Sequence, residues 1–329
     1  MTQYDVYGLG NALLDIEFEV TPEVLQDLGI DKGVMTLLDE ASQDKIVSKL
    51  GGSSDKKRSC GGSAANTLIA VSQFGGKAFY SCKVADDEPG KFYTQDLLDC
   101  GVKTNLENQS PEAGVTGKCL VFVTPDADRT MNTFLGTSGN FSTVELVPEA
   151  IENSKYTYIE GYLVSGEKSK AAAIEARKIA RSAGKKVAFT LADLNMVKFF
   201  KPGLLEIIGD GVDFLFANES EALAIADTED FDSAIAHLKT LAKGFAVTRG
   251  ASGSVVFDGE QLIEIAPFPV KAIDTVGAGD MYAGAFLYGL TNNMSFAQAG
   301  RLGSLASSTI VTTLGARMKT EDVRALLKK

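Results

Sequence analysis

The chain has 329 residues, enough for one large domain with a small appendage or for two domains, and its 45 % hydrophobic and 23 % charged residues are typical of a globular protein. The net charge of −11 argues against nucleic acid or an anionic membrane as a partner, and the four widely spaced cysteines argue against a disulfide framework or a zinc site. The sequence has neither a signal-peptide pattern nor an apolar run long enough to span a bilayer, so we expect a cytoplasmic protein.

The first residues predict strands rather than a dinucleotide-binding loop. Residues 4–14 are expected to form a buried strand, which runs on into a half-exposed strand over residues 15–20. Gly8 and Gly10 fit the start of a dinucleotide fingerprint, but Leu13 stands where its third glycine belongs.

A small sheet is predicted beside the main body. Residues 118–123 and 129–134, joined by a turn at 125–128, have the pattern of a β-hairpin that interrupts the alternation of strands and helices. This hairpin could pair with residues 15–20 and 33–38. The expected product is an antiparallel patch that stands off the body.

From residue 156 onward, strand and helix patterns alternate regularly. The expected strands are 156–163, 187–191, 214–217, 244–248 and 254–257, and the expected helices are 169–183, 219–226, 231–242, 281–290 and 296–312. Such units predict a parallel sheet covered by helices on both faces. Ligands of these sheets bind outside the carboxyl ends of the strands, where the glycine and acidic clusters of this chain fall.

The segment Asp274-Thr-Val-Gly-Ala-Gly-Asp280 carries the strongest chemical signal. Gly277, Ala278 and Gly279 precede a helix, and free N–H groups at a helix N-terminus bind anions. Asp280 would repel a bound phosphate unless it has a chemical task, such as taking a proton from an attacking hydroxyl. The motif therefore indicates phosphoryl transfer, with a plain strand-to-helix turn and an N-capping aspartate as the alternative.

Three further clusters lie at strand ends. Gly61 and Gly62 precede a helix and allow close approach of a ligand, and Asn66 one turn later offers a donor and an acceptor to hydroxyl groups. Asn218 and Glu221 fit the surroundings of a hydrated Mg²⁺, although an N-cap with first-turn acids explains them as well.

The segment Thr248-Arg249-Gly250-x-x-Gly253 joins two strands. Its hydroxyl, cation and glycines suit a nucleotide phosphate, with a hairpin turn as the alternative. The chain lacks a P-loop, the protein-kinase motifs and the Gly-x-Ser-x-Gly of hydrolases, so phosphoryl transfer would follow none of those templates.

Together, Gly-Gly-Ser-Ala-Ala-Asn at 61–66, Asn-Glu-Ser-Glu at 218–221, Thr-Arg-Gly-Ala-Ser-Gly at 248–253 and the motif at 274–280 resemble the ribokinase family, also called the phosphofructokinase-B carbohydrate kinases. Their order and spacing match across nearly the whole chain. The resemblance implies a ribokinase-like, doubly wound, mostly parallel α/β domain over residues 1–329, with a β-sheet lid from about 15–38 and 114–136.

The resemblance also implies site roles. Asp280 would be the catalytic base, and Gly277, Ala278 and Gly279 would hold the transferring phosphoryl group. The residues expected to bind the acceptor are Asn11, Asp15, Gly61, Gly62, Ser63, Asn66 and, from the lid, Arg129. The residues expected to bind ATP are Asn218, Thr248, Arg249, Gly250 and Gly253.

Two cations follow from the same resemblance. Asn218 and Glu221 would order Mg²⁺ through water. Asp274 would bind K⁺, together with backbone carbonyls near Val276 and residues 311–316.

The acceptor is less specified than the reaction. Residues 10–16 are most similar to the start of adenosine kinases within the family, with Ala12 in place of a proline. We therefore expect phosphorylation of a nucleoside, most readily adenosine, with Leu13, Phe134 and Tyr162 as possible faces for the base. A sugar such as ribose or fructose is the alternative acceptor, and a non-catalytic nucleoside sensor is a third hypothesis. Both a monomer and a homodimer are compatible with the sequence.

Overall fold

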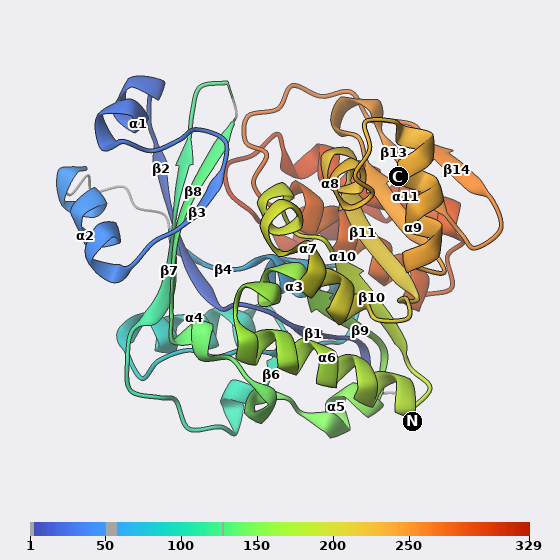
Figure 1. The fold of residues 1–329 in the computed structure, drawn as a ribbon, viewed down its shortest axis with the longest axis horizontal. Helices are drawn as coiled ribbons and strands as arrows, with labels where there is room; N and C mark the ends of the chain where they lie inside the picture. The colour runs from blue at the N-terminus through green and yellow to red at the C-terminus, as the bar shows by residue number, and fades with distance from the viewer. Residues whose placement is uncertain (1–2, 51–57, 127) are drawn as a thin grey trace.

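The computed structural model describes residues 3–50, 58–126 and 128–329, so Ala127 of the predicted hairpin turn lies outside the described residues. Figure 1 shows a large α/β body with a small sheet beside it. The large sheet has nine strands in the order β14-β13-β12-β11-β10-β9-β1-β5-β6. They are β1 (Tyr4–Leu9), β5 (Ala78–Ser81), β6 (Lys103–Thr104), β9 (Ser154–Glu160), β10 (Lys186–Thr190), β11 (Phe214–Asn218), β12 (Phe245–Thr248), β13 (Ser254–Phe257) and β14 (Leu262–Ile265).

The large sheet is mostly parallel. Every neighbouring pair from β12 to β6 is parallel, whereas β13 and β14 at the other edge are antiparallel. Long crossovers through helices produce such parallel pairs, while the short connections around β13 can only reverse the chain. The predicted doubly wound α/β class is confirmed.

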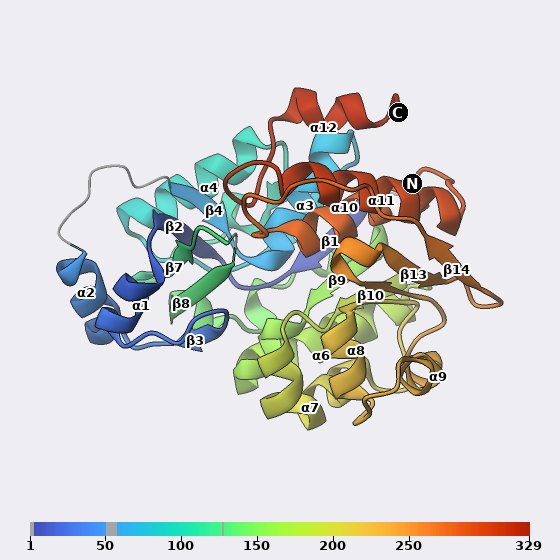
Figure 2. The same cartoon turned by 90° about the horizontal axis from the view of Figure 1, so that it is seen from above.

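Helices cover both faces of this sheet (Figure 2). One layer holds α3 (Ser63–Phe74), α4 (Glu88–Asp99), α10 (Ala278–Thr291), α11 (Phe296–Ile310) and α12 (Thr320–Leu326). The other holds α5 (Pro148–Glu152), α6 (Glu167–Ser182), α7 (Leu194–Ile208), α8 (Glu219–Ile225) and α9 (Phe231–Leu241). Short 3-10 turns occur at η1 (Asn105–Glu107), η2 (Thr137–Asn140), η3 (Thr143–Glu145), η4 (Gly161–Ser165) and η5 (Gly250–Ser252). Each layer buries its own hydrophobic core against the sheet.

The small sheet has five strands in the order β3-β8-β7-β2-β4. They are β2 (Leu13–Glu19), β3 (Met35–Leu37), β4 (Arg58–Gly61), β7 (Thr116–Val123) and β8 (Arg129–Gly136). The predicted hairpin is β7–β8, but β2 pairs parallel with β7 and β3 pairs parallel with β8, so the expected antiparallel patch is wrong for those two pairs. Sequence pattern sets which face a strand buries, whereas the direction of pairing depends on how the chain returns to the sheet.

Two helices that the sequence did not predict cover the outer face of the small sheet: α1 (Pro22–Leu28) and α2 (Glu40–Lys49). Phe18, Leu120 and Phe122 face them in one hydrophobic cluster. The alternate residues Cys119 and Val121 face the opposite way, toward the large body. This period of two gives the sheet one packed face and one face that is free to line a cavity.

The single long strand expected at residues 4–14 is in fact two strands in different sheets. The chain leaves β1 after Leu9 and enters β2 at Leu13. A Cβ on Gly10 would lie 2.4 Å from Glu160 Oε2, so only glycine fits this crossing. The backbone N–H of Ala12 donates to Ser138 Oγ at 2.8 Å instead of joining a ladder. Side-chain acceptors from distant segments therefore interrupt the strand expected at residues 4–14. The local sequence pattern does not predict these acceptors.

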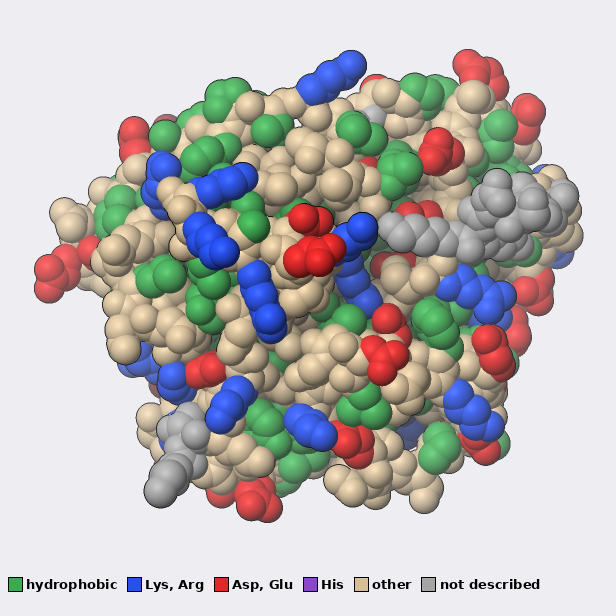
Figure 3. Space-filling model, turned by 180° about the vertical axis from the view of Figure 1, so that it is seen from behind, with side chains coloured by type: hydrophobic (Ala, Val, Ile, Leu, Met, Phe, Trp, Pro, Cys, Tyr) green, Lys and Arg blue, Asp and Glu red, His purple; other side chains and the backbone are tan. Residues whose placement is uncertain are grey.

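Acidic and basic side chains are interspersed on the face shown in Figure 3, with apolar side chains scattered among them. The net charge of −11 is thus not gathered into one acidic patch on this face. In the described part of the chain, no helix combines the length and apolar character needed to cross a membrane.

Helices α3 and α10 approach closely, and this contact positions the ends that carry the predicted site residues. A Cβ on Gly284 would lie 2.6 Å from both Ala70 Cβ and Thr67 O. The two helix backbones can be this close only because Gly284 has no side chain.

Gly284→Ala should therefore lower the free energy of unfolding by about 1–3 kcal/mol, because the added methyl group must push the helices apart. Urea denaturation measures the loss. Ala297→Val on an exposed position of α11 is the control, with an expected cost below about 1 kcal/mol. Equal stability of Gly284→Ala and the wild type would contradict the close contact.

Candidate active site

A cavity of about 340 Å³ lies between the small sheet and the carboxyl ends of the parallel strands. Most of the predicted site residues line it: Asn11, Asp15, Gly62, Ser63, Asn66, Arg129, Asn218, Glu221, Thr248, Gly277, Ala278, Gly279 and Asp280. Five of the described residues predicted for the site lie outside this lining: Gly61, Arg249, Gly250, Gly253 and Asp274.

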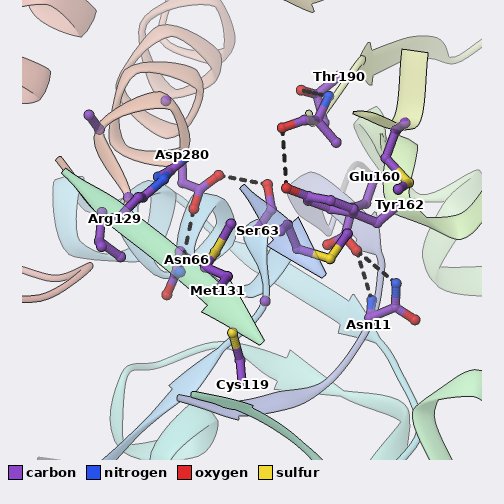
Figure 4. A pocket seen from close by; sticks show the side chains of 18 of the residues that line it. Asn11, Ser63, Asn66, Cys119, Arg129, Met131, Glu160, Tyr162, Thr190 and Asp280 are labelled. Atoms are coloured by element: carbon purple, nitrogen blue, oxygen red, sulfur yellow. Dashed lines mark hydrogen bonds between the residues drawn. The ribbon is translucent and has the colours of Figure 1, made fainter. Parts of the chain in front are cut away.

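Asp280 lies in the first turn of α10 and points into the cavity (Figure 4). Ser63 Oγ donates to Asp280 Oδ1 at 2.6 Å, and Asn66 Nδ2 donates to Asp280 Oδ2 at 3.4 Å. Both donors come from the first turns of α3. The two motifs, more than 200 residues apart in the chain, therefore meet in one hydrogen-bonded group.

The turn before α10 has the geometry of an anion site. Gly277 adopts φ 72°, and a Cβ there would lie 2.8 Å from the backbone of Ala316, so glycine is required. Helix α10 begins at Ala278 without a side-chain cap, and Gly277, Ala278 and Gly279 line the cavity, although Ala278 N also donates to Thr275 O at 3.3 Å. Arg129 from the small sheet reaches this turn, and its Nη1 donates to Thr275 O at 3.4 Å.

Asp15 also lines the cavity and is 7 % exposed. A Cβ on Gly61 would lie 2.0 Å from Asp15 Oδ1, so Gly61 makes room for this carboxylate without lining the cavity itself. Gly62 adopts φ 92°, with Asn11 O only 2.1 Å from where its Cβ would be. The two glycines thus bring the β2 backbone and the start of α3 together.

Glu160 is a site residue that the sequence analysis missed. It lies at the end of β9, is 1 % exposed, and lines the cavity. Its carboxylate accepts hydrogen bonds from Asn11 N and Nδ2, both at 3.1 Å, and from Ala64 N at 2.8 Å. The predicted strand 156–163 placed Glu160 in its interior, whereas β9 ends at Glu160. No predicted strand end therefore marked this glutamate for the site.

Asn218 and Glu221 form a capping box at the start of α8. Asn218 Nδ2 donates to Glu221 Oε1 at 2.7 Å, and Glu221 N donates to Asn218 Oδ1 at 2.8 Å. The two residues therefore do cap helix α8, as the alternative interpretation of the sequence predicted. Both residues nevertheless line the cavity, and an oxygen-rich pair of this kind suits a hydrated Mg²⁺.

The carboxylate of Asp274 joins its own loop before α10 to the loop after α11 through hydrogen bonds. Its Oδ1 accepts from Val276 N at 2.9 Å, and its Oδ2 accepts from Gly315 N at 2.7 Å. Val311 O accepts from Ile273 N at 2.7 Å. Asp274 is 1 % exposed, and backbone N–H groups bind both of its oxygens. A role for Asp274 in binding K⁺ stays a prediction.

Arg249 has partners outside the cavity. Its Nε donates to Glu219 Oε1 at 2.9 Å, and its guanidinium lies 4.4 Å from the centre of the Phe231 ring. Thr248, one residue earlier, does line the cavity. A role for Arg249 in binding ATP stays a prediction.

Burial dominates the electrostatics of the cavity. It raises the pKa values of Asp15, Glu160 and Glu221 to about 7, and it also raises the pKa of Asp280. Arg317 lowers the pKa of Asp15, and Arg129 lowers that of Asp280, each as an opposing charge. Asp15, Glu160 and Glu221 therefore hold their protons more tightly than carboxyl groups in water do.

The part of the cavity beside Asp15 has an apolar wall from the small sheet. This wall is made of Leu13, Met35, Leu37, Cys119, Val121, Met131 and Leu135. Tyr162 lines the cavity from the large body (Figure 4), whereas Phe134, also considered for contact with a base, is not among the lining residues described. The cavity is therefore lined partly by carboxyl groups and partly by apolar side chains.

Asp15→Asn should stabilise the fold at pH 8, because Asp15 binds its proton more tightly in the folded state than in the unfolded state. Between about pH 4 and pH 7 the folded protein then holds more protons, so this group makes stability fall as pH rises. The expected gain at pH 8 is about 1–3 kcal/mol, shrinking toward pH 4.

Thermal unfolding of Asp15→Asn at several pH values measures this gain. Asp126→Asn on the same sheet is the control, because the hydrogen bond from Lys32 lowers the pKa of Asp126 to about 2 and its loss should not stabilise. A lower Tm for Asp15→Asn than for the wild type at pH 8 would contradict the raised pKa.

Comparison with known proteins assigns this architecture to a family. The family model described as "pfkB family carbohydrate kinase" matches residues 43–322. A probable sugar kinase protein from Rhizobium etli is 33 % identical with a TM-score of 0.94, over 100 % of this chain and 98 % of that one. Adenosine kinase from Sinorhizobium meliloti is 35 % identical with a TM-score of 0.93, over 99 % of each chain.

Adenosine kinase from Saccharomyces cerevisiae is 27 % identical over 96 % of this chain and 97 % of its own length. Adenosine kinases and sugar kinases are thus comparably similar to the chain. The chain belongs to the pfkB family of carbohydrate kinases, and it is a phosphotransferase that acts on a hydroxyl group.

Proposed function

We propose that the chain transfers the γ-phosphate of ATP to the 5′-hydroxyl of a nucleoside, with adenosine as the preferred acceptor. The proposal is supported chiefly by the position of Asp280, which lines the cavity directly after Gly277, Ala278 and Gly279 and accepts hydrogen bonds from Ser63 and Asn66. A hydroxyl that enters from the side of Asp15 and Asn66 reaches the carboxylate and a phosphoryl group at the same point.

In the proposed reaction, Asp280 accepts the proton of the acceptor hydroxyl as its oxygen attacks the γ-phosphorus. The bond from that phosphorus to the bridging oxygen of ADP breaks, and the proton later passes to solvent. The N–H groups of Gly277, Ala278 and Gly279 stabilise the negative charge on the transferring group. Arg129 adds a positive charge over the same turn and helps to exclude water.

Mg²⁺, when bound, neutralises phosphate charge, and the cavity-lining oxygens of Asn218 and Glu221 would hold it through water. Thr248 would contact ATP from the end of β12, with Gly250 and Gly253 shaping the following turn. We propose K⁺ at Asp274, where it would support the anion-binding turn without touching the acceptor.

The apolar wall favours a nucleoside over a free sugar. A base packed against Leu13, Met131 and Leu135 would bury apolar surface, whereas a free sugar would leave these side chains against water. Asp15 and Asn66 would accept and donate hydrogen bonds to the ribose hydroxyls. The similarity to sugar kinases keeps ribose and fructose as the second candidate acceptors.

Asp280→Asn should keep acceptor binding and lower kcat by roughly 10²–10⁴-fold, because the amide cannot accept the proton. Coupled ADP release measures turnover, and calorimetry measures binding. Asp128→Asn, a lining carboxyl in the small sheet to which no catalytic step is assigned, is the control with near-normal kcat. Full turnover by Asp280→Asn would sink the assignment of the base.

ADP release measured with adenosine, inosine, guanosine, ribose and fructose separates the two acceptor classes. We expect the nucleosides, adenosine first, to have the highest kcat/KM. Leu135→Asn should raise the KM for adenosine roughly tenfold, because it places an amide against the base. Turnover of sugars alone, or an unchanged KM in Leu135→Asn, would refute the nucleoside proposal and leave the family assignment intact.

A further inference from the structure

Arg317 connects the loop after α11 to the proposed acceptor site, although no motif marks it. Its side chain is 14 % exposed. Its Nε donates to Asn66 Oδ1 at 3.2 Å, and its Nη1 donates to Asp96 Oδ2 at 2.7 Å. One guanidinium thus joins a helix of the site, α3, to α4 beside it.

The bond from Arg317 selects one orientation of the Asn66 amide. An amide offers an acceptor at one end and a donor at the other. With Oδ1 held by Arg317 Nε, Nδ2 faces Asp280 Oδ2 at 3.4 Å. In the flipped orientation two donors would face each other at Arg317 and two oxygens would face each other at Asp280. Arg317 therefore makes the arrangement around Asp280 unique.

Arg317 Nε and Nη1 are held by hydrogen bonds, whereas its buried Nη2 has no hydrogen-bond partner among the described residues. Asp96 Oδ2, its partner, also accepts from Cys60 N at 2.9 Å. On either side of Arg317, Gly315 N donates to Asp274 and Gln73 Nε2 donates to Met318 O, both at 2.7 Å. The same short loop places Ala316 against Gly277 of the anion-binding turn. The loop therefore contacts both Asn66 and Gly277, and it can fix the position of one relative to the other.

We infer that Arg317 is a positioning residue for phosphoryl transfer, which acts through Asn66 to orient Asp280 toward the acceptor hydroxyl. The inference rests on the proposed function. Arg317 itself does not line the described cavity. A change at Arg317 that keeps its positive charge near Asp15 should consequently lower kcat through Asn66, and it should do so only while Asn66 is present.

The test compares Arg317→Met and Arg317→Lys with Arg324→Met in a coupled ADP-release assay. Arg324 lies in the same C-terminal segment and donates to Gln73 O of α3 at 3.2 Å, so its variant controls for the loss of an arginine against that helix. We expect both Arg317 variants to lose roughly 10- to 100-fold in kcat and Arg324→Met to retain near-normal kcat. Lysine keeps the charge but cannot present two donors in a fixed fork, so Arg317→Lys stays informative if Arg317→Met folds poorly.

A double-mutant cycle with Asn66→Ala distinguishes positioning through Asn66 from a purely structural role of Arg317. In the Asn66→Ala background, Arg317→Lys should lower kcat by less than twofold further. Independent, multiplying losses, or normal kcat in folded Arg317→Lys, would overturn the inference. A wild-type protein without turnover on any acceptor would instead refute the proposed function.

Discussion

The hydrogen bonds from Ser63 and Asn66 to Asp280 join the starts of α3 and α10, and the proposed chemistry depends on that junction. The helices can meet there because Gly284 lets their backbones touch further along. The proposed anion-binding turn, formed by Gly277 and the first two residues of α10, is positioned by the same contact. Phosphoryl transfer asks little covalent chemistry of the protein, so this fixed geometry is the main contribution expected from the fold.

Holding carboxyl groups in a cavity has a thermodynamic consequence. Asp15, Glu160 and Glu221 are each at most 7 % exposed, and burial opposes their ionisation. Backbone N–H donors and two arginines, Arg129 and Arg317, offset part of that cost. The buried carboxyl groups of the site therefore lower the stability of the fold, a cost that is common at functional sites.

The sequence predicted the large sheet well, because buried parallel strands and amphipathic helices leave local periodic signals. Most of the residues that the glycine and acidic motifs at strand ends predicted for the site also line the cavity. The covering helices α1 and α2 and the strand β4 escaped prediction. These elements bury their apolar side chains only by packing in or on the small sheet. The strand order of that sheet cannot be predicted from a local sequence pattern.

Residues whose roles depend on distant partners were also missed. Glu160 acquires its role from Asn11, 149 residues away, and Arg317 from Asn66, 251 residues away. A lone glutamate or arginine carries no such information in a single sequence. Conversely, the predicted ATP contact Arg249 is held by Glu219 and Phe231 next to the cavity, which a motif cannot reveal.

A crystal structure with adenosine and a non-hydrolysable ATP analogue would show where the two reactants bind. We expect the 5′-oxygen within hydrogen-bonding distance of Asp280, the ribose hydroxyls at Asp15 and Asn66, and the terminal phosphate at Gly277 to Gly279. The base should pack against the wall that contains Leu135. Adenosine bound with its 5′-oxygen turned away from Asp280, or with its ribose away from Asp15, would refute the roles proposed for these two aspartates.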